Sequence, residues 1–379
     1  MLRRWAQRRS VSALDAERKG EPWPIAAGLR VLSGLYGGVV RIRNAQYDAG
    51  RRRAAALPWP VISVGGLTAG GSGKTPAVVL VAHELGEIGL RPLILIRGYG
   101  APRPVKKPLL VDAAEPGAWR AAGDEAVLLS QRCPEAAVAV HPNRARAAHH
   151  AAQQVSFDAV LLDDGFQHRR LERDLDLVVW DASRRLGSGR LLPHGDLREP
   201  WSSLRRADAV LLSRYQSADR RPPPSGLPAL PSLRLGWRLG RFTPLGGGDD
   251  LEPAALSGRR LAAAAGIARP WRFLRDLEAI GLDVVGHELL PDHSPLAPGD
   301  LRRWKARRAA EDWEALVITE KDAVRWKADL EDWDGEVLVA RGAAHWWTDT
   351  DRDFARELLR EAVQRQKRRA RFGRTRRRG

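Results

Sequence analysis

The chain has 379 residues, 44% of them hydrophobic, and a formal net charge of +17. This length allows two domains, and the hydrophobic fraction allows real cores. The single cysteine, Cys133, excludes an internal disulfide and fits a reducing compartment. The N-terminus is rich in arginine, but no apolar region with a small-residue cleavage site follows promptly, so we expect no secretory signal.

Much of the positive charge lies in the C-terminal tail. Nine Lys or Arg residues and no acid lie between Arg365 and Gly379, and the run Arg51–Arg53 adds more basic charge. Such charge predicts an anionic partner: nucleic acid, acidic lipid or a phosphorylated substrate. A disordered, solubilising tail is the alternative.

Residues 22–40 form an apolar stretch that one arginine interrupts. A membrane-spanning helix needs about 20 uninterrupted apolar residues, so this stretch suits a helix that lies in a membrane interface. Trp23 and Tyr36 would anchor it, and Arg41 and Arg43 would lie at the lipid surface. The alternative is a helix packed on the protein's own core.

A glycine-rich turn follows the β-branched run Val61–Val64 and ends in Gly-Lys-Thr. Eight of its residues are predicted to bind a nucleoside triphosphate: Thr68, Ala69, Gly70, Gly71, Ser72, Gly73, Lys74 and Thr75. In such a turn, backbone N–H groups surround the phosphates, the lysine contacts the outer phosphates, and the hydroxyl binds Mg²⁺. Thr68 stands where the general motif has glycine, and an ordinary strand-to-helix turn with an incidental lysine is the alternative.

Short apolar runs alternate with helical patterns in this part of the chain. The expected buried strands are Val61–Val64, Pro92–Ile96, Ala137–Val140, Ala159–Leu162, Leu177–Trp180 and Ala209–Leu212. The expected helices are Ala77–Ile88, Glu125–Arg132 and Arg144–Gln153. This alternation predicts a predominantly parallel sheet covered by helices on both faces, the arrangement of P-loop NTPases.

A smaller α/β pattern follows a break in composition. Gln216–Pro231 is rich in proline and charge and predicts a linker, and Gly246–Gly248 is a second loose point. The strands expected beyond are Leu261–Ala265, Leu282–Val285, Ala315–Thr319 and Glu336–Ala340. The helices expected there are Trp271–Ile280, Pro298–Ala309 and Arg352–Arg365.

The second strong feature is the apolar strand Ala159–Leu162, which leads directly into Asp163, Asp164 and Gln167. In P-loop enzymes a carboxylate at such a strand end holds Mg²⁺, and this hard cation prefers oxygen ligands. These three side chains are therefore candidate metal ligands. A solvated acidic turn is the alternative.

With these motifs the chain resembles the tetraacyldisaccharide 4′-kinase family, the lipid A 4′-kinases of Gram-negative bacteria. The resemblance rests on ordered motifs at Arg43-Asn44, Val64–Pro76, Arg97–Gly100, Gly123–Glu125, Asp163–His168, Leu191–Pro200, Gly266–Phe273, Asp292-His293 and Thr319–Val324. The family's P-loop also has threonine in place of the first glycine, so Thr68 favours this family. The chain departs from the family pattern at Gly66 and Ala126, neither of which is a reactive group.

The resemblance implies transfer of the γ-phosphate of ATP, with Mg²⁺, to the 4′-hydroxyl of a tetraacyldisaccharide 1-phosphate. It implies a monomer on the cytoplasmic face of the bacterial inner membrane, with an acylated disaccharide 1-phosphate lipid as substrate and no nucleic acid partner. It also implies two α/β/α domains with the active site in the cleft between them. The expected segments are an N-terminal membrane-interface helix region (1–50), a P-loop kinase domain (51–235), a smaller α/β domain with linker (236–345), and a C-terminal helix with the basic tail (346–379).

The resemblance further implies roles for single residues. Lys74 would contact the transferred phosphate, Asp124 would be the catalytic base, and His293 would be its partner from the second domain. Glu199 would join Thr75, Asp163, Asp164 and Gln167 around the metal. On local grounds alone, Asp124 could instead cap a helix, and His293 could be an ordinary loop histidine.

Two other P-loop classes compete with this interpretation. A GTPase would carry an Asn/Thr-Lys-x-Asp element, but in Thr319–Asp322 the lysine and the aspartate are adjacent, so the spacing is wrong. A nucleic-acid-dependent ATPase would fit the basic tail, yet Phe372 is the only aromatic residue there and no nucleic-acid module is recognisable.

Overall fold

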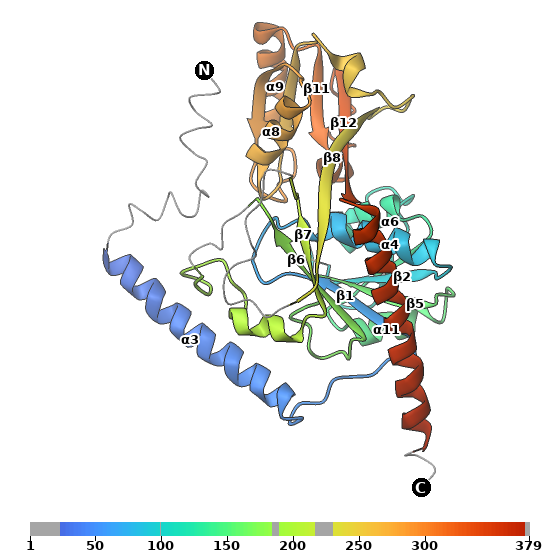
Figure 1. The fold of residues 1–379 in the computed structure, drawn as a ribbon. Helices are drawn as coiled ribbons and strands as arrows, with labels where there is room; N and C mark the ends of the chain where they lie inside the picture. Colours follow the sequence, from blue (N-terminus) through green and yellow to red (C-terminus); the bar gives the residue numbers. More distant parts are fainter. Residues whose placement is uncertain (1–22, 99, 184–188, 217–229, 376–379) are drawn as a thin grey trace.

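The computed structural model describes residues 23–98, 100–183, 189–216 and 230–375. Within these ranges the strands form one 12-stranded sheet with the order β10-β9-β11-β12-β8-β7-β6-β1-β5-β2-β4-β3. Strands β8 and β12 connect two lobes of this sheet (Figure 1). The predicted linker Gln216–Pro231 lies almost wholly outside the described residues, as do Tyr99 and the last arginines of the tail.

The first lobe contains strands β1 to β7, which pair in parallel except for the short edge strand β3. Their bounds are Val61–Gly65 (β1), Pro92–Ile96 (β2), Leu109–Leu110 (β3), Ala137–Val140 (β4), Ala159–Asp163 (β5), Leu175–Asp181 (β6) and Ala209–Ser213 (β7). The central strands are short apolar runs buried along their whole length, as a doubly covered parallel sheet requires. The predicted strands of this region are therefore confirmed.

Helices cover both faces of the first lobe. Their bounds are Lys74–Glu87 (α4), Trp119–Ala122 (α5), Asp124–Arg132 (α6), Arg144–Ala151 (α7) and Asp349–Thr375 (α11). Alternate residues of β1 serve the two cores: Ile62 packs with α4, α6 and α11, whereas Val61 packs with α7. The C-terminal helix α11 thus returns to the first lobe and contributes Leu359 and Ala362 to its core.

The second lobe is a smaller layered unit. Its strands are Leu261–Ala265 (β9), Val284–Leu289 (β10) and Ala315–Thr319 (β11), and its helices are Pro270–Ala279 (α8), Pro298–Glu311 (α9) and Glu320–Trp326 (α10). Phe273 and Leu277 of α8 pack on one face of the sheet, and Trp304 of α9 and Trp326 of α10 pack on the other. The predicted α/β fold, with a large and a small layered part, is confirmed.

Two long strands join the lobes: β8 (Ser232–Pro244) and β12 (Glu336–Trp346). The start of β8 pairs in parallel with β7, and its remainder pairs antiparallel with β12 (Figure 1). Strand β8 was not predicted from the sequence, because arginines and glycines interrupt its apolar positions. The boundary expected between residues 235 and 236 falls inside this strand, so the lobes share a strand at that point.

Helix α3 (Trp23–Asp48) lies along the first lobe (Figure 1). Polar side chains on one side of the helix bond to that lobe. The Ser33 hydroxyl donates to the Leu191 carbonyl at 2.8 Å, the Tyr36 hydroxyl donates to the Arg198 carbonyl at 2.8 Å, and Arg43 donates to the Gln167 carbonyl at 2.7 Å. Tyr36 and Arg43 therefore bond to the protein, which corrects the expectation that they face lipid.

The opposite side of α3 is apolar and exposed. Its large exposed side chains are Ile25, Val31, Leu32, Leu35, Val39 and Ile42, and each is more than half accessible. Residues 24–48 are also long and apolar enough to cross a membrane, by length and composition alone. The inner side of α3 packs on the first lobe, with Val40 buried and Tyr36 against a core cluster, as the alternative of a helix packed on the protein's own core expects. Its outer apolar side is left exposed, as a helix in a membrane interface requires.

Candidate active site

The glycine-rich turn connects β1 to α4, as the sequence predicted, and α4 begins at Lys74. Gly70 and Gly73 have positive φ angles of 72° and 84°, a conformation that other residues rarely adopt. The turn is fixed on both flanks: the Ala69 N–H donates to the Asp196 carbonyl at 2.8 Å, and the Ser213 hydroxyl donates to the Ser72 carbonyl at 2.8 Å. The loop is therefore held open at the N-terminus of a helix, where a phosphate binds well.

The acidic segment lies beside this loop. Strand β5 pairs with β1, with Asp163 opposite Val64, so the acids follow the strand adjacent to the P-loop strand. Lys74 Nζ lies 3.7 Å from a carboxylate oxygen of Asp164, and Arg198 forms an ion pair with the other oxygen. The two strongest motifs of the sequence thus meet at one edge of the sheet.

The acceptor set around Asp163 fits a hard cation. Asp163 is 3% exposed, and burial, together with the Glu125 and Asp164 carboxylates, raises its pKa to about 7. Oδ1 of Asp164 and Oε1 of Gln167 are buried and accept no hydrogen bond within the described part of the chain. A divalent cation here would give these oxygens a partner and keep Asp163 ionised.

Thr75 and Glu199, the other two predicted metal ligands, differ in their surroundings. Thr75 is the second residue of α4, directly after Lys74. Glu199 is 1% exposed and pairs with Arg206 at 2.8 Å and with the Asn44 amide of α3 at 3.0 Å. Its Oε1 accepts no hydrogen bond within the described ranges, so one oxygen remains for a metal.

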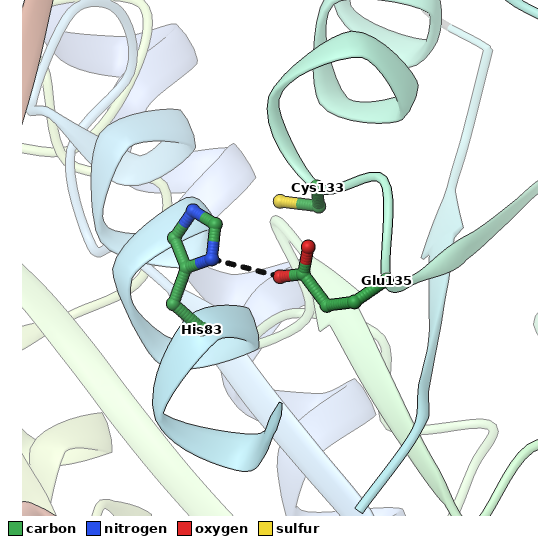
Figure 2. A group of neighbouring side chains, drawn as sticks. All are labelled: His83, Cys133 and Glu135. Atoms are coloured by element: carbon green, nitrogen blue, oxygen red, sulfur yellow. Dashed lines mark ion pairs between the residues drawn. The ribbon is translucent and has the colours of Figure 1, made fainter. Parts of the chain in front are cut away.

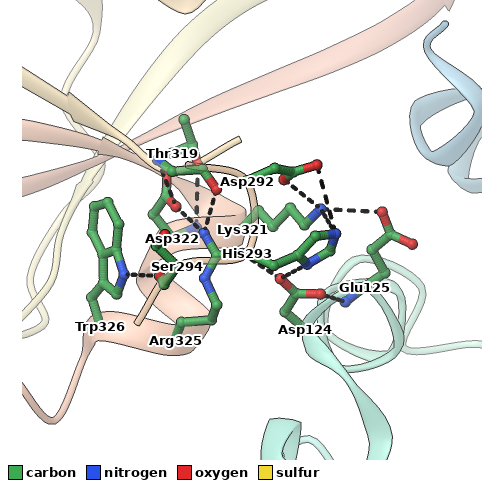
Figure 3. A network of polar contacts seen from close by, with 11 residues as sticks. Asp124, Glu125, Asp292, His293, Ser294, Thr319, Lys321, Asp322, Arg325 and Trp326 are labelled. Atoms are coloured by element: carbon green, nitrogen blue, oxygen red, sulfur yellow. Dashed lines mark hydrogen bonds and ion pairs between the residues drawn. The ribbon is translucent and has the colours of Figure 1, made fainter. Parts of the chain in front are cut away.

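Asp124 and His293 are in contact across the two lobes (Figure 3). Nδ1 of His293 lies 2.9 Å from Oδ2 of Asp124, which is fully buried. The other carboxylate oxygen of Asp124 accepts the Glu125 N–H at 2.8 Å, so this residue also stabilises the start of α6. Asp124 is itself the first residue of α6, and the N-cap is Gly123, which makes no side-chain cap hydrogen bond. The helix-cap alternative is therefore wrong, and the pairing with His293 is present in the structure.

Cations of the second lobe surround this pair. Arg325 forms buried ion pairs with Asp124 and Asp322, and Lys321 Nζ lies 3.2 Å from Glu125 and 3.3 Å from His293 Nε2 (Figure 3). Burial alone would raise the pKa of Asp124, but the His293 hydrogen bond and the charges of Lys321 and Arg325 lower it. The same hydrogen bond raises the pKa of His293. The pair is thus stabilised in its charged form.

One cavity of about 1210 Å³ joins these groups. The P-loop from Ala69 to Pro76 lines it, and so do Asp163, Asp164 and Gln167. Glu125 and His293 line the same cavity from the side of the Asp124 pair. Arg198 and Arg97 also line it: Arg198 is paired with Asp164, whereas Arg97 is exposed.

A separate group of ligand-type side chains lies at the far ends of α4 and α6: His83, Cys133 and Glu135 (Figure 2). His83 and Glu135 form an ion pair at 2.8 Å. Burial, with the Glu135 charge, raises the pKa of the Cys133 thiol to about 12, so the thiol stays protonated. Cys133 belongs to the core of the first lobe, whereas His83 also lines the cavity.

A family model for tetraacyldisaccharide-1-P 4′-kinase matches residues 25–364. A tetraacyldisaccharide 4′-kinase of Anaeromyxobacter dehalogenans (strain 2CP-C) is 43% identical over 337 residues, which cover 83% of this chain and 86% of that protein. One from Geobacter metallireducens is 40% identical over 302 residues, which cover 79% of this chain and 88% of that protein.

The chain belongs to the tetraacyldisaccharide 4′-kinase family. A crystal structure described as the "apo" form of LpxK from Aquifex aeolicus in complex with ATP matches with a TM-score of 0.72 at 29% identity. The match covers 89% of this chain and 99% of that chain. The resemblance inferred from the motifs is thereby confirmed.

Two buried charged residues near the cavity were not predicted from the sequence. Arg325 lies one residue beyond the Thr319–Val324 motif, and Asp181 ends the strand after the acidic segment. Both are buried and ionic, and both make contacts between the lobes. An isolated acid or arginine gives no local pattern, and only the directly adjacent motif could have drawn attention to Arg325.

Proposed function

We propose that this chain is an ATP-dependent lipid kinase that phosphorylates the 4′-hydroxyl of a tetraacyldisaccharide 1-phosphate in lipid A biosynthesis. Its membership of the family supports this activity. The observation that carries the proposal is the single cavity that both the P-loop and His293 line. A phosphate donor and a hydroxyl acceptor can meet there, and phosphoryl transfer depends mainly on positioning and charge.

The P-loop side of the cavity would hold the triphosphate of ATP. Backbone N–H groups of residues 70–73 would bind the phosphates, and Lys74 would offset negative charge on the transferred group. Thr75, Asp163, Asp164, Gln167 and Glu199 are the candidates for holding Mg²⁺, which would neutralise charge on the phosphates. Arg198, already paired with Asp164, would hold that carboxylate in place.

The other side would accept the proton of the attacking hydroxyl. Asp124 has no exposed surface, whereas the His293 side chain is 21% exposed and lines the cavity. We therefore assign the proton to the Asp124–His293 pair, in which His293 faces the acceptor and the Asp124 carboxylate stabilises the positively charged imidazolium. As the 4′-oxygen bonds to the γ-phosphorus, the bond from that phosphorus to ADP breaks.

Helix α3 would bring the lipid to this cavity. Its inner residues Tyr36, Val40 and Arg43 line the cavity, while its outer face is apolar and exposed. We propose that the outer face lies in the cytoplasmic leaflet of the inner membrane and that a monomer carries the whole site. The disaccharide could then reach His293 while its acyl chains remain in lipid.

The test is transfer of label from γ-labelled ATP to tetraacyldisaccharide 1-phosphate in detergent micelles with Mg²⁺. The proposal predicts labelled lipid whose formation stops when either lipid or Mg²⁺ is left out. Parallel reactions with labelled GTP, or with added nucleic acid and no lipid, test the competing classes. Label released only as inorganic phosphate, in proportion to added nucleic acid, would refute the lipid kinase.

A further inference from the structure

Two arginines at the start of α8, in the second lobe, reach the P-loop of the first lobe. Arg272 lies 2.7 Å from Asp181 Oδ2, 3.2 Å from the Ser183 hydroxyl and 3.4 Å from the Gly71 carbonyl. Arg269 lies 3.3 Å from the same oxygen of Asp181, and its side chain packs directly against Gly71. Apart from Gly71, none of these residues belongs to the P-loop, the acidic segment or the Asp124 pair.

Asp181 is the anchor of these contacts. It ends β6, the strand that pairs with β1 on the side opposite β5, so it flanks the P-loop strand. Its side chain is 3% exposed. Burial opposes its charge, and the two arginines and Ser183 more than offset that effect, so the pKa of Asp181 is lowered. A buried carboxylate of the first lobe is thus stabilised by cations of the second lobe.

The contacts with Gly71 connect this ion pair to nucleotide binding. Gly71 has a φ angle of 37° in the middle of the P-loop. Arg272 approaches its carbonyl oxygen, and in a P-loop it is the N–H groups that face the phosphates. Arg272 therefore holds the loop at a carbonyl group rather than at the phosphate-binding N–H groups, and Arg269 limits the room into which Gly71 could move. Both arginines also line the cavity.

We propose that Arg272 and Asp181, with Arg269, form a clasp between the lobes that positions the P-loop for ATP. Arg272 is a positioning residue, because it acts on the phosphates through Gly71. The inference rests on the proposed function only in that the P-loop binds ATP. The cations of the clasp come from the second lobe, which also carries His293. Docking of that lobe would therefore support the P-loop and bring His293 to the cavity at the same time.

A second inter-lobe ion pair on the same helix provides a comparison. Arg214, next to Ser213 at the end of β7, pairs with Asp276 of α8 through two contacts of 2.9 Å. Asp276 lies one turn after Arg272 and makes no contact with the P-loop among the described contacts. Asp276→Asn therefore weakens docking of the lobes without removing the brace on Gly71. Arg275→Ala, on the exposed side of α8, is the silent control.

The experiment is equilibrium binding of labelled ATP with Mg²⁺ to purified full-length chains, without lipid. We expect Arg272→Ala and Asp181→Asn each to weaken ATP binding by about tenfold, the usual scale for one charge-assisted contact. The double variant should bind about as weakly as the weaker single variant, because both changes break one clasp. Arg272→Lys should restore part of the affinity, since lysine keeps the charge but loses the planar fork. Asp276→Asn should weaken binding by less than about threefold.

The outcomes separate this inference from the proposed function. If the unaltered chain binds no ATP, the proposed function fails and the clasp fails with it. If the unaltered chain binds ATP and Arg272→Ala binds equally well, only the clasp is refuted. The clasp would also be refuted if the losses of ATP affinity caused by Arg272→Ala and Asp181→Asn added fully in the double variant. A loss of ATP affinity in Asp276→Asn equal to that in Arg272→Ala would refute it as well. Should Arg272→Ala fail to fold, Arg272→Lys and Asp181→Asn carry the same comparison.

Discussion

The two sides of the cavity are built in different ways. On the P-loop side, Lys74 and Thr75 begin the helix that the glycine-rich turn joins to β1, and Asp163 and Asp164 lie at the end of the neighbouring strand β5. On the other side, Asp124 of the first lobe meets His293 and Arg325 of the second, across separations of 169 and 201 residues. We call the P-loop side, which would hold ATP, the donor side, and the Asp124–His293 side, which would hold the attacking hydroxyl, the acceptor side. Local sequence therefore specifies the donor side, whereas only the docking of the lobes assembles the acceptor side.

This difference predicts different consequences when each side is altered. Substitutions on the donor side should abolish catalysis without changing how the two lobes dock. Damage to the acceptor side should affect catalysis together with the docking of the lobes. The following four predictions test that contrast.

Lys74→Ala should reduce turnover on the order of 10³-fold or more, because the lysine offsets charge that develops on the transferred phosphoryl group. The measurement is the steady-state rate of label transfer, with the melting temperature as a check on the fold. Lys107→Ala removes an exposed lysine of the same lobe and should leave the rate unchanged. Near-normal activity of Lys74→Ala would reject the P-loop assignment.

Asp124→Ala should reduce turnover on the order of 10²-fold or more, because the Asp124–His293 pair that accepts the proton would lose its carboxylate. It should also lower the melting temperature, since it leaves Arg325 buried with only Asp322 as a carboxylate partner. His293→Ala separates the two effects, because His293 is partly exposed and lies outside that buried ion pair. If Asp124→Ala lost stability alone, with its rate intact, the role of Asp124 would be structural, as the buried partner of Arg325.

Replacing Leu35 and Val39 by serine should weaken membrane binding at least about tenfold, because two exposed apolar side chains of α3 would no longer enter lipid. Sedimentation with anionic vesicles measures the bound fraction. The contacts of Ser33 and Tyr36 on the inner side remain, so activity on short-chain substrate in micelles should persist. Unchanged sedimentation would place the membrane contact elsewhere, for example in the basic tail.

The Asp124–His293 pair should give a small pH dependence of stability. The pKa of His293 is raised in the folded chain, so its contribution is complete below its usual pKa and is lost as the pH rises through the raised value. The pKa of Asp124 is lowered, so its contribution is lost only as the pH falls through that lower value. His293→Gln should therefore lower the melting temperature by roughly 2 °C near pH 6 and by less near pH 9. An equal difference at both pH values would contradict the charged pair.

The same contrast explains what the sequence could predict. Strands such as Pro92–Ile96 and Ala315–Thr319 appear with their predicted bounds, because an uninterrupted apolar run identifies a doubly covered strand. The long strand β8 was missed, because its two faces differ and its residues read as a loose connection. The prediction that Tyr36 and Arg43 of α3 face lipid was wrong, since both side chains bond to the first lobe.

The acceptor side could not be predicted from local sequence patterns alone. Asp124 and His293 were proposed from motifs of the family, and their contact depends on how the two lobes dock. Arg325, Asp181 and Arg272 belong to no pattern that periodicity or spacing detects. Arg325 and Asp181 are buried ionic groups, and Arg272 pairs with Asp181, which only the folded chain shows.

The central claim is that donor and acceptor sides act on one phosphoryl group in one cavity. A single-turnover reaction tests it most directly, with enzyme in excess over γ-labelled ATP and with lipid and Mg²⁺ present. The account predicts that the unaltered chain moves the label to lipid, and that Asp124→Asn retains the label in enzyme-bound ATP. Transfer at equal rates by both chains, or release of bound ATP on changing Asp124 alone, would contradict the claim.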